Sequence, residues 1–177
     1  MAACSSSSFT AELAAAEIGA TFNQYADSPL RRARLVAYLD ERADAELLLV
    51  GEAAGYRGAR VSGLAFTSER QLTGAGPAEA SATIVHRALD ELGLRDCVLL
   101  WNLVPTHPGT ERSNRRPTRA EIRAARPFLE RLAEGRRVIP VGRLAHEELG
   151  GGYVRHPAHG GAAGFRAGLL RFAAGAP

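Results

Sequence analysis

The sequence lacks lysine altogether, and all 22 of its basic residues are arginine. With a formal net charge of +3 and a pI near 9.3, the chain is mildly basic, which suits a polyanionic partner without identifying one. Arginine in place of lysine, with abundant alanine and glycine, is also typical of a GC-rich genome. A binding surface must therefore be sought where arginine clusters, not in the total charge.

Cysteine and long apolar runs are also scarce. Cys4 and Cys97 cannot build a disulfide framework or a four-cysteine metal site, so we expect no structural metal. No apolar run approaches the roughly 20 residues that cross a bilayer, and residues 1–8 lack the basic start and apolar centre of a secretion signal. We therefore expect a cytoplasmic protein with no membrane partner.

Three short apolar runs, at residues 47–50, 98–101 and 138–141, predict buried strands that end at Gly51, Asn102 and Gly142. Helical patterns at residues 30–42, 78–92 and 118–132 alternate with these runs, which predicts parallel βαβ units. Ser28-Pro29 opens the first of these helices, and Thr118 with Glu121 has capping-box spacing before the last. The order predicts one layered α/β unit.

The amino-terminal part is predicted to be a polar tail over residues 1–8, followed by a helix over residues 11–20 capped by Thr10. We divide the single globular unit into residues 1–27, this tail and helix, and residues 28–177, the main domain. Loops at the carboxyl ends of parallel strands form the binding edge of such sheets. Residues 51–69, 102–116 and 155–161 are therefore expected to converge on one face.

Several short motifs follow these strands in a specific order. They are Gly-Glu-Ala-Ala-Gly at 51–55, Gly-Leu-Ala-Phe-Thr at 63–67, Asn102, Ser-Asn-Arg-Arg-Pro-Thr-Arg-Ala-Glu-Ile at 113–122, Arg-Pro-Phe-Leu at 126–129, Val-Gly-Arg-Leu-Ala at 141–145 and His-Pro-Ala at 156–158. Together they resemble the uracil-DNA glycosylase superfamily, especially its bacterial and archaeal family-four and family-five enzymes. The resemblance covers roughly residues 47–172. It implies a three-layer α/β/α sandwich around a central, mainly parallel four-stranded sheet.

The resemblance also implies an activity: a monofunctional DNA-repair enzyme that flips uracil out of DNA and hydrolyses its N-glycosidic bond. Family-four enzymes carry an iron–sulfur cluster, but Thr106 and Ala125 stand where two of its cysteines are expected, so we expect no cofactor. Ala54 replaces the usual proline of the first motif, and residues 159–161 replace a bulkier wedge loop. These departures leave the subfamily and the preferred base open.

Hydrolysis of the N-glycosidic bond passes through a transition state that is positive on the sugar and negative on the departing base. The enzyme therefore needs one group near the sugar to stabilise the positive charge and another near the base to stabilise the negative charge. The most familiar members carry an aspartate where this chain has Ala53. Glu52 matches the family-four acid and Glu69 the family-five acid, so both remain candidates to orient the water. Either could instead cap a helix.

The resemblance assigns the base pocket to residues of the same motifs. Phe66 is expected to stack on the extruded base and Asn102 to pair with its polar edge, since one amide offers both a donor and an acceptor. His156 is expected to donate to the base carbonyl, with His159 a competing candidate. The remaining first-loop candidates are Gly51, Ala53 and Tyr56, the last of which could crowd the methyl group of thymine.

A dense basic stretch that includes Arg112, Arg115, Arg116 and Arg119 is predicted to contact the DNA backbone. We expect a monomer whose partner is DNA containing uracil or another deaminated base. One alternative is a glycosylase for hypoxanthine, xanthine or mismatched bases, and another is a catalytically weak DNA-binding relative. An unrelated nucleotide-binding protein is disfavoured, because the chain has neither a Walker loop nor a full Gly-x-Gly-x-x-Gly fingerprint.

Overall fold

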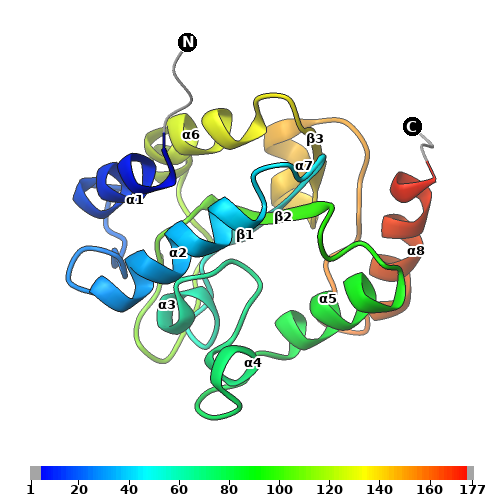
Figure 1. The fold of residues 1–177 in the computed structure, drawn as a ribbon, viewed down its shortest axis with the longest axis horizontal. Coiled ribbons are helices and arrows are strands. Elements are labelled where there is room, and N and C mark those ends of the chain that lie inside the picture. The colour runs from blue at the N-terminus through cyan, green and yellow to red at the C-terminus, as the bar shows by residue number, and fades with distance from the viewer. Residues whose placement is uncertain (1–4, 175–177) are drawn as a thin grey trace.

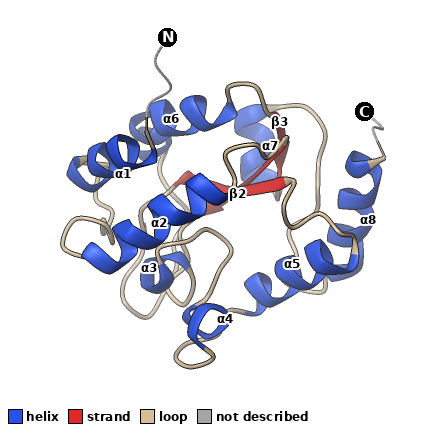
Figure 2. Ribbon diagram, viewed as in Figure 1, coloured by secondary structure: helices blue, strands red, loops and turns tan. Residues whose placement is uncertain are grey.

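A parallel three-stranded sheet forms the centre of the fold in the computed structural model, which describes residues 5–174 (Figures 1 and 2). The strands β1 (Leu47–Ala53), β2 (Val98–Val104) and β3 (Arg137–Pro140) lie in the order β2-β1-β3. The register places Gly51 of β1 opposite Asn102 of β2. All three strands were predicted from their apolar runs, but β1 and β2 extend three residues further than expected.

The expected fourth strand is reduced to a single bridge in the described part of the chain. Val141 pairs with Val154 in parallel, and the amide of Gly142 donates to the carbonyl of Val154 at 2.8 Å. Gly150 and Gly151 have φ angles of +69° and +73°, so the backbone turns just before Val154 and does not run extended into it. The three-layer fold class is confirmed, with one strand fewer than predicted.

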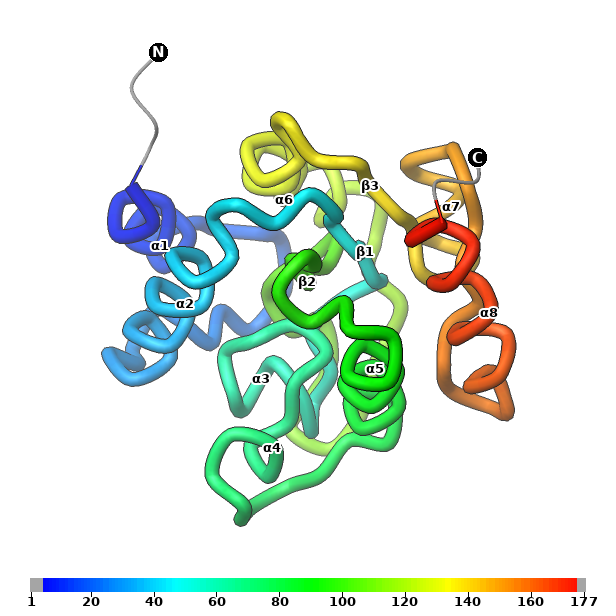
Figure 3. The backbone as a smooth tube through the Cα atoms, turned by 45° about the vertical axis from the view of Figure 1, so that its right-hand side comes forward, coloured from blue at the N-terminus to red at the C-terminus, as the bar shows by residue number. Residues whose placement is uncertain are grey.

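Helices cover both faces of the sheet, as Figures 1 and 3 show from two directions. On one face lie α1 (Ser6–Ala15), α2 (Pro29–Glu41), α6 (Arg119–Ala133) and α7 (Arg143–Leu149), and on the other lie α5 (Ala80–Glu91) and α8 (Ala162–Ala173). Because side chains alternate along a strand, Leu48 and Val50 enter the first core and Leu49 enters the second. Two further short helices, α3 (Ala59–Ser62) and α4 (Glu69–Thr73), lie in the connection after β1.

The starts of three helices can be compared with the capping residues that the sequence predicts. Ser28 caps α2 and the Thr118–Glu121 capping box begins α6, as predicted. The predicted start of α1 was wrong: the Ser5 hydroxyl accepts from the Ser8 amide, so the helix begins at Ser6, and Thr10 is buried inside it. Part of the predicted polar tail is thus helical, and its first four residues, with Cys4, lie outside the described residues.

None of the helices within residues 5–174 has both the length and the apolar character that crossing a membrane requires.

Phe9 of α1 packs edge-on against Trp101 and Phe128, at ring-centroid distances of 5.7 and 5.6 Å. This contact places α1 in the same core as β2 and α6.

Glu121 anchors the segment that leads into α6. Its buried carboxylate accepts two hydrogen bonds from Arg115, at 2.9 and 2.6 Å, and one from the Thr118 amide at 2.8 Å. The hydrogen bonds from Arg115 lower the pKa of Glu121 to about 2, although desolvation acts in the opposite direction. The chain before α6 is therefore fastened by an ion pair between residues only six apart.

We predict that Glu121→Gln lowers the free energy of unfolding by about 2 kcal/mol at pH 7, a value reduced from the full pKa shift because Arg115 is partly exposed. The folded-state pKa is depressed, so this stabilisation is present above the ordinary value of 4.5 and is lost as the pH falls through about 2. Urea unfolding across that range should show the gap between wild type and variant closing. Exposed Glu130→Gln on the same helix is the control, and a gap that does not change with pH would contradict the account.

Candidate active site

An open cleft of about 560 Å³ lies at the carboxyl ends of the strands, where the three predicted loops meet. A smaller pocket of about 60 Å³ adjoins it and shares part of its wall. The small pocket is lined by Glu52, Ala53, Gly55, Ala59, Phe66, Glu79, Ser81, Asn102 and His156. Four of the predicted site residues with chemically active or aromatic side chains therefore meet in one place: Glu52, Phe66, Asn102 and His156.

Phe66 reaches this pocket because Gly51 has no side chain. A Cβ atom at residue 51 would overlap the Phe66 ring and come within 2.8 Å of Oδ1 of Asn102. Gly51 does not line the pocket itself. It provides the space in which the aromatic ring lies beside the amide.

The backbone around Phe66 is held in an uncommon conformation. Phe66 has a φ of +51°, which typically costs about 1–3 kcal/mol for a residue with a side chain. Next to it, Thr67 donates to the Ala65 carbonyl at 3.1 Å and lies 2.9 Å from Nε2 of His86. Arg95 donates to Nδ1 of His86 at 3.0 Å, so the neutral ring carries its proton on Nε2 and donates it to Thr67. Burial and then the Arg95 charge lower the pKa of His86 to about 4, which keeps the ring neutral.

Asn102 is a buried residue of the pocket lining, with only 4% of its surface exposed. Its amide has no hydrogen-bond partner among residues 5–174, although it lines the pocket. The amide atoms of Asn102 are not among the fully enclosed unpaired atoms of residues 5–174, so they keep some exposure to the pocket. The amide is therefore available to a polar molecule in the pocket.

His156 has a defined proton position. The Ala158 amide donates to its Nδ1 at 3.2 Å, so the neutral ring carries its proton on Nε2. Burial, and secondarily the charge of His159, lowers the pKa of His156, which favours this neutral donor. The ring centroid lies 6.4 Å from that of Phe66. His159 is exposed, has a φ of +52° and lines only the outer cleft.

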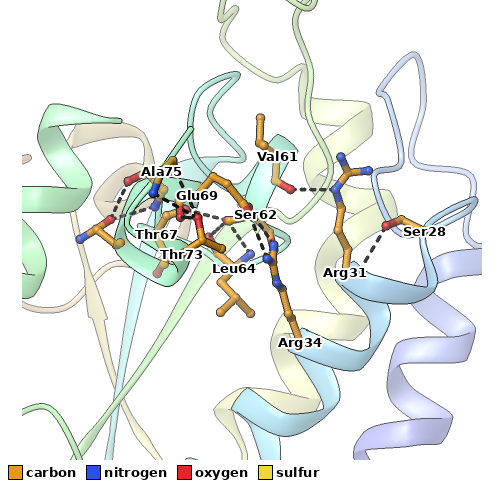
Figure 4. Close-up of polar contacts among 12 residues, drawn as sticks. Ser28, Arg31, Arg34, Val61, Ser62, Leu64, Thr67, Glu69, Thr73 and Ala75 are labelled. Atoms are coloured by element: carbon orange, nitrogen blue, oxygen red, sulfur yellow. Dashed lines mark hydrogen bonds and ion pairs between the residues drawn. The ribbon is translucent and has the colours of Figure 1, made fainter. Parts of the chain in front are cut away.

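The two candidate carboxylates lie in different places. Glu52 lines both the pocket and the cleft, and burial raises its pKa while Arg116 opposes the rise and Glu147 adds to it. Glu69 lines neither of them. It begins α4 and accepts hydrogen bonds from the two terminal guanidinium nitrogens of Arg34, at 2.8 and 2.9 Å (Figure 4). These bonds lower the pKa of Glu69. The structure thus removes Glu69 from the site by pairing it with α2.

The first loop does not present all the predicted side chains. Ala53 lines the pocket, but Tyr56 does not. The Tyr56 amide donates to Oδ1 of Asn114 at 2.9 Å, and the guanidinium of Arg57 lies 5.3 Å from the centre of its ring. The expectation that Tyr56 crowds a bound base is therefore not supported by its position.

Buried His107 joins two of the converging loops, a role that the sequence analysis missed. Its Nδ1 lies 2.7 Å from the Ala54 carbonyl and its Nε2 lies 2.7 Å from the Thr110 carbonyl. A neutral ring can donate to only one of these oxygens, whereas an imidazolium donates to both. The first motif loop is thereby fastened to the segment after β2.

The two positions associated with cluster cysteines are occupied by core packing. The Thr106 hydroxyl lies 2.6 Å from that of Thr21, and Ala125 is fully buried on the side of α6 that faces the core. Within the described ranges, no three histidine, cysteine or acidic side chains are placed to hold a metal ion. The residues present do not fit an iron–sulfur cluster at these positions.

The predicted arginines divide into two groups. Arg115 and Arg116 line the cleft, but Arg115 is bound to Glu121 and Arg116 pairs with Glu147 at 2.9 Å. The other two, Arg112 and Arg119, are exposed outside the cleft. Arg143, which was not predicted, lines the cleft and has no ion pair in the part of the chain that the structure describes.

Glu79 and Ser81 were also missed, although both line the pocket and the cleft. They lie at the start of α5, outside every recognised motif. No local signal marks them, because only the packing of α5 beside the first loop brings them to the site.

These features define an α/β enzyme domain with its site at the carboxyl edge of a parallel sheet, where an aromatic ring, an amide, an imidazole and a carboxylate face one pocket. The model of the Uracil DNA glycosylase superfamily matches residues 39–170, most of the chain. The chain therefore belongs to this superfamily, and it is a DNA glycosylase, an enzyme of base excision repair whose substrate is DNA.

A solved structure supports the same fold. The crystal structure of wild-type SMUG2 from Pedobacter heparinus matches with a TM-score of 0.66 and 12% sequence identity, over 94% of this chain and 96% of that chain. A comparison with curated protein sequences found no match.

Proposed function

We propose that this DNA glycosylase hydrolyses the N-glycosidic bond of uracil in DNA and leaves an abasic site. The observation that carries the proposal is the small pocket, in which Phe66, Asn102, His156 and Glu52 share one wall surface. Each side chain offers a contact that excision of uracil requires. The pocket opens into the wider cleft, through which an extruded nucleotide can enter.

The proposed recognition of the base uses Phe66 and Asn102. The Phe66 ring supplies an aromatic face, on which a stacked base gains roughly 1–3 kcal/mol. The unpaired amide of Asn102 offers an acceptor for the uracil N3–H and a donor for the adjacent carbonyl oxygen. Cytosine presents an acceptor and a donor in the reverse order, so an amide oriented to accept from N3–H and donate to the carbonyl oxygen favours uracil.

The proposed chemistry divides between His156 and Glu52. As the C–N bond breaks, negative charge gathers on the departing base, and the Nε2–H of His156 stabilises it by donating to a base carbonyl oxygen. Glu52 is the carboxylate that orients the attacking water and stabilises positive charge on the sugar. Burial raises the pKa of Glu52, and the nearby charge of Arg116 opposes this rise and so favours the ionised form. The ion pair of Glu69 with Arg34, outside the pocket, supports Glu52 over Glu69 for this role.

Binding of the DNA backbone is proposed to use the arginines at the cleft rim. Arg143 has no ion pair within residues 5–174, and Arg116 can exchange its exposed partner Glu147 for a phosphate. Arg112 and Arg119 are exposed and could extend this surface, whereas Arg115 mainly holds Glu121.

The proposed reaction is hydrolysis without a lyase step that depends on a lysine nucleophile, since the sequence contains no lysine.

A second candidate is a broader range of bases that includes hypoxanthine or xanthine. The position of Tyr56 favours it, because the Tyr56 side chain does not line the pocket, where Gly55 forms part of the wall. A pocket without this obstruction leaves room for a larger base.

We predict that purified protein releases uracil from single-stranded or duplex oligonucleotides, detected as strand breaks after alkaline treatment. Matched oligonucleotides with thymine, hypoxanthine or xanthine at the same position define the range. Release of uracil supports the proposal. Release of only a purine base would replace it with the second candidate, and no release of any base would contradict both.

We further predict that His156→Ala lowers the single-turnover rate about a hundredfold to a thousandfold, because a preorganised donor to the leaving group is lost. DNA affinity, measured by fluorescence anisotropy, should change little, since phosphate contacts supply most of it. His159→Ala is the matched control and should retain the rate within about fivefold. A larger loss in His159→Ala than in His156→Ala would reverse the assignment.

A further inference from the structure

Glu79 occupies an unusual place at the start of α5. It stands at the N-cap position, yet its side chain makes no capping hydrogen bond to the helix. The side chain instead reaches the first motif loop, where its two carboxyl oxygens lie in the space that Cβ atoms at Gly55 and Gly58 would fill. The two glycines of the loop therefore make room for an acid that comes from another element.

This placement puts the Glu79 carboxyl group on the pocket wall with Phe66, Asn102 and His156. Among the described residues, the carboxyl group has neither a hydrogen-bond donor nor a cationic partner. Burial alone raises the pKa of Glu79. A half-buried carboxylate without compensation is costly, and a carboxylic acid in the same position is much less so.

The other charged groups of the site favour placing the proton on Glu79. Glu52 lines the same pocket, and burial raises the pKa of both acids. At Glu52 the charge of Arg116 opposes the rise that burial and the charge of Glu147 produce, whereas no positive charge within the described ranges opposes the effect of burial at Glu79. In the outer cleft, Arg116 is paired with Glu147 and Arg115 with Glu121, while Arg143 and His159 lie along its wall. His156 is the remaining titratable group of the pocket.

We propose that Glu79 is a base-contacting residue that acts as a neutral carboxylic acid and donates its O–H to an acceptor atom of the extruded base. This rests on the proposed function of the pocket. The base then meets two neutral donors, Nε2–H of His156 and the carboxyl O–H of Glu79. The hydrogen bonds from both donors strengthen as negative charge develops on the departing base, and no proton needs to be transferred to the base.

The test compares Glu79→Gln with Glu79→Ala in single-turnover base release between pH 5 and 9. Gln keeps a neutral donor, so at pH 6 its rate should lie within about fivefold of wild type, whereas Ala should lose about a hundredfold. The wild-type rate should fall on the alkaline side as Glu79 ionises, and this fall should be absent in Glu79→Gln. Exposed Glu130→Ala is the matched control and should behave as wild type.

Equal losses in Glu79→Gln and Glu79→Ala would overturn the proposal, because they would show that a charge or the exact shape is needed. A Glu79→Ala rate within threefold of wild type would overturn it as well, as would an alkaline fall that persists in Glu79→Gln. Circular dichroism at each pH verifies that the variants are folded.

A second measurement does not depend on catalysis. Carbon-detected NMR of the side-chain carboxyl groups, with signals assigned by their loss in Glu79→Gln and Glu52→Gln, should show Glu79 ionising at a higher pH than Glu52. The reverse order would overturn the proposal even if every rate agreed. A wild-type enzyme that releases no base would instead refute the proposed function, and the titration would still decide whether Glu79 is the protonated acid of the pocket.

Discussion

The site depends on one close contact at the carboxyl end of β1, where Gly51 leaves room for a ring and an amide to lie side by side. Parallel pairing places Gly51 opposite Asn102, and any Cβ atom at residue 51 would overlap Phe66 and press on that amide. The ring reaches this position through a left-handed backbone at residue 66, held by the hydrogen bonds of Thr67 and His86. Strain of this kind persists only where the surrounding structure enforces it, which is common at functional sites.

Ion pairs outside the pocket determine which carboxyl groups remain available inside it. Arg34 holds Glu69 against α2, and Arg115 holds Glu121 at the start of α6, so neither acid is available to the pocket. Two acids remain at the pocket wall, Glu52 and Glu79; burial raises the pKa of both, and the charge of Arg116 opposes the rise at Glu52. Neutral His156, with its proton on Nε2, completes a set of groups that can stabilise opposite charges at the two ends of a breaking bond.

Much of the fold could be predicted because its signals are local. Three apolar runs identified the strands, the Thr118–Glu121 capping box identified the start of α6, and the motif order led to the superfamily. The features that the sequence left open or did not mark depend on distant contacts. The motifs support Glu52 and Glu69 equally as the acid of the site, and the two are distinguished by the ion pair between Glu69 and Arg34 of α2. Tyr56 was expected at the pocket, but its ring lies beside the guanidinium of Arg57. Glu79 carries no motif, because it reaches the pocket through the packing of a helix.

Substitution of Gly51 by alanine tests most directly whether the contact at the end of β1 creates the pocket. The account predicts that Gly51→Ala remains folded and binds DNA with near-normal affinity, while its single-turnover rate of base release falls at least tenfold, because Phe66 and Asn102 can no longer lie together. Gly164→Ala, at an exposed helical position beside the flexible side chain of Arg155, is the matched control and should leave the rate unchanged. A Gly51→Ala enzyme that releases its base at the wild-type rate would contradict the account.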